Sequence, residues 1–164
     1  MKIFLIIIGS VLAAISLVLL IGWLLPVKHK ASRSLLLDAE IERVWQRLVS
    51  YENMPKWRLE LQSVEQVGTD VWEETTKEGK SIAFATVEET QPYRLKREIV
   101  GEGLMFGGSW TFELRCKGQQ TELTITENGE VYNPLFRFVA KYVIGHHRSM
   151  DKYMQQLLLS LPAT

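Results

Sequence analysis

The chain ends with VYNPLFRFVAKYVIGHHRSMDKYMQQLLLSL, residues 131–161, which has the pattern of one long amphipathic helix. Asn133 can accept a hydrogen bond from a backbone N–H of the first turn, and Pro134 stands at the first helical position, where proline loses no hydrogen bond. Apolar side chains then recur every three or four residues as far as Leu161, so we expect one face to be buried. No helix of similar length is predicted in the soluble part of the chain, and we therefore expect that face to lie on a sheet.

The residues before this helix predict that sheet. Strand-like runs separated by turn signals occur at 32–37, 59–67, 71–77, 81–89, 93–100, 104–116 and 121–131. The connections between the last six runs are short, which favours antiparallel neighbours. Gly107 and Gly108 interrupt the longest run and indicate a bulge or bend, as a curving sheet requires. Between the first two runs we expect a helix at 39–50, capped by Asp38, and a short helix at 52–57.

A separate apolar segment opens the chain. Residues 3–25 contain no ionisable side chain, and their number exceeds the roughly 20 residues needed to cross a bilayer core. A secretory signal has a shorter apolar region followed by a cleavage site between small residues, and Leu24-Leu25-Pro26-Val27-Lys28 offers none. We therefore predict an uncleaved transmembrane anchor at 1–27 and a single soluble domain at 28–164.

The residues that follow the apolar segment suggest how it sits in a membrane. Trp23 suits the interfacial position, and Lys28, Lys30 and Arg33 form a basic collar suited to anionic headgroups. Against Lys2 alone, these charges favour the cytoplasmic side for the soluble domain by the positive-inside rule. The sequence thus predicts a single-pass membrane protein.

Composition and charge exclude few functions. The 19 basic residues balance the 19 acidic residues of this 164-residue chain, which gives no argument for a nucleic-acid partner. Its single cysteine, Cys116, excludes a disulfide within the chain. The pair His146-His147 does not predict a metal site, because adjacent helical positions point about 100° apart and no second cluster of ligands stands at suitable spacing. We expect no metal, no cofactor and no catalytic signature.

The order of the predicted elements, with four segments of sequence, resembles the SRPBCC superfamily, also called START-like or helix-grip. The segments are residues 38–45, 51–57, 106–110 and 121–138. Within the superfamily, the chain looks closest to the polyketide cyclase/dehydrase and lipid-transport branch. The resemblance covers roughly residues 30–161. It implies an α+β helix-grip fold, in which a curved antiparallel seven-stranded sheet surrounds the long C-terminal helix. Because it lies in order and spacing rather than in a catalytic motif, it bears on fold more than on function.

The resemblance also implies an elongated apolar cavity between sheet and helix, open at one end and suited to lipids, sterols or polyketides. The positions that would line it are Trp57, Phe84, Leu95, Ile99, Phe106, Trp110, Phe112, Ile125, Phe138 and Tyr142. The alternative for each of them is ordinary core packing, since side chains fill small interiors by default. His146 is expected to be a core or pocket histidine.

Three charged residues continue the inward-facing lines of their strands. Arg97 follows Leu95, and Glu127 follows Ile125, so we expect a guanidinium and a carboxylate to meet at one end of the cavity. Such a pair would anchor a ligand head group or exchange protons with it. Glu88 follows Phe84 in the same phase. The alternative is that these charges reach water at the strand ends.

Three functions remain, and we rank them in this order. The first is a membrane-anchored binding module for a hydrophobic small molecule or lipid, because an anchor raises the local concentration of lipid-soluble molecules. The second is a cyclase- or dehydratase-like enzyme that uses an inward carboxylate as general acid or base. The third is a scaffold domain that binds another membrane protein. Gly145, near the middle of the predicted helix, is where we expect any bend that admits a ligand.

Overall fold

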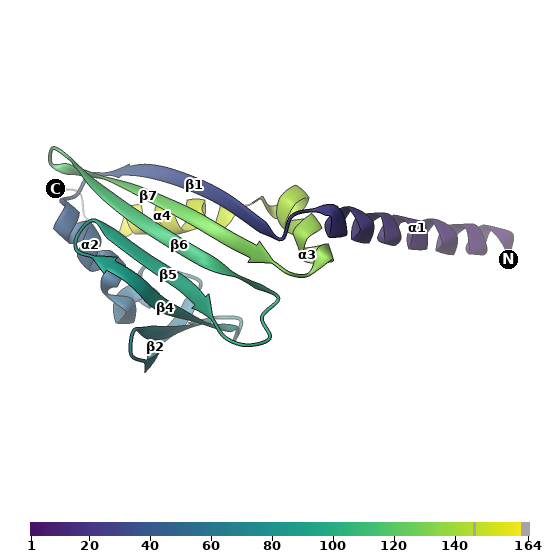
Figure 1. Ribbon diagram of the computed structural model, residues 1–164, viewed down its shortest axis with the longest axis horizontal. Helices are drawn as coiled ribbons and strands as arrows, with labels where there is room; N and C mark the ends of the chain where they lie inside the picture. The colour runs from purple at the N-terminus through teal and green to yellow at the C-terminus, as the bar shows by residue number, and fades with distance from the viewer. Residues whose placement is uncertain (146, 162–164) are drawn as a thin grey trace.

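The computed structural model describes residues 1–145 and 147–161. The elements follow in the order α1 (Lys2–Leu24), β1 (Lys28–Leu37), α2 (Ile41–Val49), the 3₁₀-helix η1 (Tyr51–Lys56), β2 (Leu61–Gly68), β3 (Val71–Thr76), β4 (Ser81–Thr90), β5 (Arg94–Val100), β6 (Phe106–Lys117), β7 (Gln120–Val131), α3 (Pro134–Val139), the π-helical segment η2 (Ala140–Ile144) and α4 (Arg148–Ser160). Figure 1 shows one curved sheet with α2 and α4 behind it, while α1 extends away from the domain.

The seven strands form one antiparallel sheet in the order β1-β7-β6-β5-β4-β3-β2. Six of the strands are therefore consecutive hairpin neighbours, and β1 closes the sheet by pairing with the last strand. The predicted α+β helix-grip fold class is confirmed, and each of the seven predicted strands is present. The first strand begins at Lys28, earlier than predicted, so the basic residues Lys28, Lys30 and Arg33 belong to the sheet edge.

The hydrophobic core lies where α2 and α4 cover the sheet. Trp45 of α2, Phe112 of β6 and Leu157 of α4 are each at most 1% exposed. Burial of one such side chain stabilises the fold by about 1.5–3 kcal/mol, so this layer holds the domain together. The amphipathic pattern of the C-terminal segment is therefore satisfied by α4, which buries Met150, Tyr153, Met154 and Leu157.

The prediction of one continuous C-terminal helix is wrong. The segment divides into α3, η2 and α4, and the break falls at Gly145, the position where the sequence predicts a bend. Gly145 has a φ of +79°, which glycine adopts without the steric cost that a Cβ would add. The predicted start is confirmed, because the Asn133 side chain accepts N–H bonds from Leu135 at 2.9 Å and Phe136 at 3.3 Å.

The prediction that Asp38 caps α2 is also wrong. The helix begins at Ile41, and its N-cap residue Glu40 makes no side-chain capping bond. The Asp38 side chain instead accepts a hydrogen bond from Gln120 at 3.5 Å. The turn before α2 is held by β7, since the buried Thr121 hydroxyl donates to the carbonyl of Ala39 at 2.7 Å. A tertiary contact has taken the place of the local cap.

Among the described residues, α1 is the one helix long and apolar enough to cross a membrane. Its last turn packs against α3, where Gly22 lies so close to Pro134 that a side chain at position 22 would collide with the Pro134 carbonyl. Arg137 donates to the carbonyls of Trp23 at 3.3 Å and Leu25 at 2.8 Å. The end of α1 is thus fixed to the domain through α3.

Candidate functional site

A cavity of about 580 Å³ lies between the sheet and the C-terminal helical segments. This volume is within the ~300–1,000 Å³ range of small-molecule sites. Strands β4 to β7 supply one wall, and Ala140, Ile144, Gly145 and the first turns of α4 supply the other. The break at Gly145 therefore lies on the cavity wall.

The structure brings part of the predicted set to this cavity. The predicted residues that line it are Phe84, Arg97, Ile99, Phe106, Trp110, Phe112 and Glu127. They share the inward-facing side of their strands, as period-two alternation requires. Phe106 is 39% exposed, which places it at the rim.

Other predicted residues lie elsewhere. Leu95 and Ile125 are fully buried and flank Phe112 in one cross-strand row, and they belong to the hydrophobic core rather than to the cavity lining. Trp57 packs edge to face on Tyr153 at 5.2 Å. Phe138 and Tyr142 lie against each other with their ring centres 5.1 Å apart, and they are not among the residues that line the cavity. His146 lies outside the described residues.

Arg97 and Glu127 do not meet as expected. Both are paired with Trp110 in the sheet register, one on each side of it. Neighbouring strands lie about 4.8 Å apart, so the two backbones are roughly 10 Å apart with an indole between them. Both side chains face the cavity, as the alternation along their strands predicts, but alternation does not tell which strands are neighbours. The two charges occupy separate parts of the cavity wall.

Arg97 is 6% exposed and forms no ion pair with any residue that the structure describes. Its guanidinium donates to the Leu48 carbonyl and lies 4.4 Å from the ring centre of Tyr51 and 5.4 Å from that of Phe112. Its Nε has no hydrogen-bond partner among the described residues. Within the part of the chain that the structure describes, aromatic faces and one carbonyl thus hold a buried cation without a carboxylate.

Tyr153 of α4 crosses the same part of the cavity. It is 5% exposed, and its ring lies 5.6 Å from Trp110 and 5.7 Å from Phe112. Burial raises the pKa of its hydroxyl, and the positive charges of Arg97 and Arg58 oppose that rise. The hydroxyl has no hydrogen-bond partner among the described residues. In the sequence, Tyr153 is one of the apolar positions that recur along the C-terminal segment, and nothing else in its surroundings there marks it as a site residue.

A network of ion pairs borders the part of the cavity that Tyr153 lines. Arg58 donates to Glu74 at 2.7 Å and to Glu60 at 3.0 Å, and Lys152 of α4 lies 3.3 Å from Glu60. Burial lowers the pKa of Arg58, but the Glu74 charge and hydrogen bond outweigh it, and the net pKa is raised. For Glu60, burial is likewise outweighed by a backbone hydrogen bond and the Arg58 charge, so its pKa is lowered. Both groups stay charged at neutral pH.

At the β1–β7 side of the cavity, His29 Nε2 lies 3.4 Å from Glu127 Oε1. Burial lowers the pKa of His29. Gly129 leaves room for the imidazole, because a side chain there would collide with the ring. The predicted first strand begins at residue 32 and therefore leaves His29 out. The strand begins at Lys28, and two-residue alternation then puts His29 on the same face as the buried Ala31. Among the described residues, no group of three His, Cys, Asp or Glu side chains gathers to hold a metal ion.

Glu88 is not on the inward line as expected. The register between β4 and β5 shifts between Thr86 and Glu88. Such a bulge adds one residue to the strand and transfers the following side chains to the other face. Glu88 accordingly accepts a hydrogen bond from Arg94 at 2.7 Å and does not line the cavity.

Solved structures share this architecture at low sequence identity. A truncated norcoclaurine synthase from Thalictrum flavum aligns with a TM-score of 0.66 at 12% identity, covering 84% of this chain and 96% of that one. A START superfamily protein from Mycobacterium smegmatis gives 0.64 at 14%, covering 79% and 94%. A conserved protein from Geobacillus kaustophilus gives 0.64 at 18%, covering 80% and 93%. Identities this low show the fold alone.

No curated protein matches the sequence. The family described as polyketide cyclase / dehydrase and lipid transport matches residues 28–161, which include every strand and the three C-terminal helical segments α3, η2 and α4. With the fold, this match supports the superfamily expected from the sequence. The chain belongs to the polyketide cyclase/dehydrase and lipid transport family.

Proposed function

We propose that this protein is a membrane-anchored binding module for a hydrophobic small molecule or lipid, held between the sheet and the C-terminal helical segments. The observation that carries the proposal is the cavity of about 580 Å³, whose walls include Phe84, Ile99, Phe106, Trp110 and Phe112. A domain that served only as a scaffold would need no such space, because interiors are normally filled by side chains.

The anchor in this proposal is α1. The helix spans 23 residues, and its side chains are almost all exposed, as a lipid-facing helix requires. A tether of this kind keeps the cavity within reach of lipid-soluble molecules at high local concentration. The basic residues of β1 favour the cytoplasmic side for the domain.

The test is native mass spectrometry of the full chain, purified from membranes in mild detergent. We expect a reproducible co-purified molecule, and its loss from Ile99→Trp, which places an indole in the cavity. Leu159→Trp is the matched control, because Leu159 is 78% exposed on α4 and does not line the cavity. Circular dichroism checks that both variants fold. Absence of any bound molecule from the unsubstituted chain would refute the binding function.

One observation favours a second candidate, an enzyme of the cyclase or dehydratase kind. Glu127 and His29 lie 3.4 Å apart on the cavity wall, an arrangement suited to general acid or base chemistry. The same mass measurement separates the candidates through Glu127→Gln. A binding module carries the same molecule with and without the substitution. An enzyme carries substrate in Glu127→Gln and product in the unsubstituted chain, and the two molecules then differ in mass.

A further inference from the structure

The α3–η2 segment exposes an apolar face that no described element of the chain covers. Leu135, Phe136, Tyr142, Val143 and Ile144 are between 42% and 69% exposed. Leu135 and Phe136 belong to the first turn of α3, and Tyr142, Val143 and Ile144 end η2. We call Leu135, Phe136, Tyr142, Val143 and Ile144 the α3 surface. Contiguous apolar surface of this kind marks an interaction site.

The same segment also carries basic residues. Arg137 donates to the carbonyls of Trp23 and Leu25, and the exposed Lys141 places its ammonium 5.4 Å from the ring centre of Tyr142. Apolar side chains bordered by basic ones are the composition of a helix that lies in a membrane interface. The segment thus has the side-chain composition of an interfacial helix, although it is short.

The contact with α1 fixes the depth of the α3 surface. Pro134 abuts Gly22, which lies two residues before the end of α1, a rise of about 3 Å. The helix is about 35 Å long at 1.5 Å per residue, against a hydrocarbon core of about 30 Å. When α1 crosses a bilayer, its last turn therefore stands at the boundary between hydrocarbon and headgroups. Since α3 begins beside that turn, α3 lies at the same boundary.

The cavity reaches the same segment. Ile144 belongs to the α3 surface and also lines the cavity, together with Gly145 and the half-exposed Phe106 at the start of β6. We propose that the α3 surface rests in the leaflet that α1 enters, and that the cavity opens into that leaflet, so that an amphiphile passes between bilayer and cavity without crossing water. This rests on the proposed function, in which α1 is the anchor.

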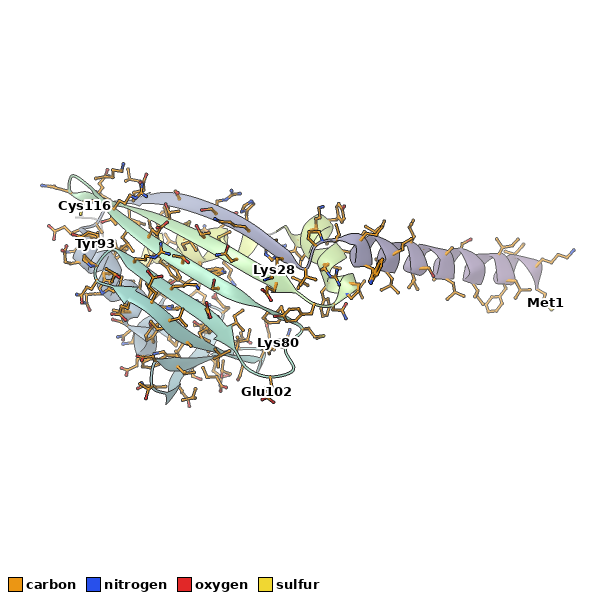
Figure 2. The ribbon with its side chains drawn as sticks, viewed as in Figure 1. Met1, Lys28, Lys80, Tyr93, Glu102 and Cys116 are labelled. Carbon is orange, nitrogen blue, oxygen red and sulfur yellow. The ribbon has the colours of Figure 1, made fainter. Side chains whose placement is uncertain are left out.

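The experiment places a nitrobenzoxadiazole label on the full chain reconstituted in phosphatidylcholine vesicles that contain doxyl-labelled lipid. One variant carries the label after Val143→Cys and Cys116→Ser. The control is the label on the native Cys116, which is exposed and lies at the far end of the domain from α1 (Figure 2).

We expect quenching by the doxyl lipid to be several-fold stronger at position 143 than at Cys116. Equal, weak quenching at the two positions would overturn the proposal. Alkaline carbonate extraction tests the anchor separately, because a chain released by carbonate does not span the membrane. The co-purified molecule tests ligand binding separately, so failure of either part is distinguishable from failure of the α3 surface.

Discussion

The two halves of the C-terminal segment share one sequence pattern but differ in what covers them. Segment α4 buries four side chains against the sheet, whereas neither α3 nor η2 buries any. Both halves repeat apolar residues at helical spacing, so the pattern shows which face avoids water but not which surface covers it. In α4 the cover is the sheet. For α3 and η2 the proposed cover is the bilayer, and each prediction below tests this difference.

The largest effect is expected from shortening an apolar side chain in each half. Leu157→Ala in α4 removes a fully buried side chain and should lower the free energy of unfolding by about 2–5 kcal/mol. Val143→Ala in η2 removes a side chain that is 69% exposed and should change it by less than about 0.5 kcal/mol. Denaturant unfolding of the full chain in detergent, followed by circular dichroism, measures both. Similar losses in the two variants would mean that both halves are packed in the core.

The next effect concerns the joint between α1 and α3. Gly22→Leu places a side chain where the Pro134 carbonyl lies, and overpacking of this kind costs about 1–3 kcal/mol. We expect the amides of α3 to exchange with solvent about tenfold faster in hydrogen-exchange mass spectrometry. Gly9→Leu is the matched control, since a side chain at Gly9 meets nothing within 4 Å. If the amides of α3 exchange at the same rate in both variants, α1 and α3 are not in contact.

A smaller effect is expected at the break between the halves. Gly145→Ala adds a Cβ at a φ of +79°, which should lower the free energy of unfolding by about 1–2 kcal/mol. Ser149→Ala, in the exposed first turn of α4, should change it by less than about 0.5 kcal/mol. Thermal unfolding of both variants checks this. An increase in stability for Gly145→Ala would show that α3, η2 and α4 merge into one helix, and the comparison would then fail.

The smallest effect is a pH dependence at the β1–β7 side of the cavity. Burial lowers the pKa of His29 from its ordinary 6.5, so below that pH the unfolded chain binds this proton more readily than the folded chain. Stability should therefore fall as the pH decreases below about 6.5, and His29→Gln should remove that part of the slope. Glu60 acts in a separate window, because its lowered pKa contributes stability that is lost only below about 4.5. Unfolding curves from pH 7.5 to 5.5 measure the His29 contribution, and an unchanged slope in His29→Gln would contradict it.

Much of the fold was predictable because local patterns decide it. Alternation along the strands, the glycine-rich turns and the cap at Asn133 are each read within a few residues, and the seven strands follow from them. The continuity of the C-terminal helix was not predictable from periodicity, which is the same on both sides of Gly145. The turn before α2 is held by Thr121 rather than by a cap from Asp38, and Thr121 lies more than eighty positions away in the sequence.

The candidate site was predictable only in part, for a related reason. Strand phase correctly turned Arg97 and Glu127 inward, but their separation depends on Trp110 lying between them in the sheet. Glu88 left the predicted line through a bulge that its sequence does not mark. The ion-pair network of Arg58, Glu60, Glu74 and Lys152 joins residues from a turn, from β3 and from α4, and such convergence is a property of the assembled fold.

The pairing of β1 with β7 has a mechanical consequence. β1 follows α1 after three residues, and its register with β7 is unbroken from Lys28 opposite Glu130 to Leu37 opposite Thr121. Figure 1 shows α1 continuing roughly along the direction of β1. A pull on the domain through α1 therefore acts along the ladder and loads its hydrogen bonds in shear, all together rather than one after another. The strand that joins the domain to its N-terminal helix is thus also the one built to resist being drawn out of the sheet.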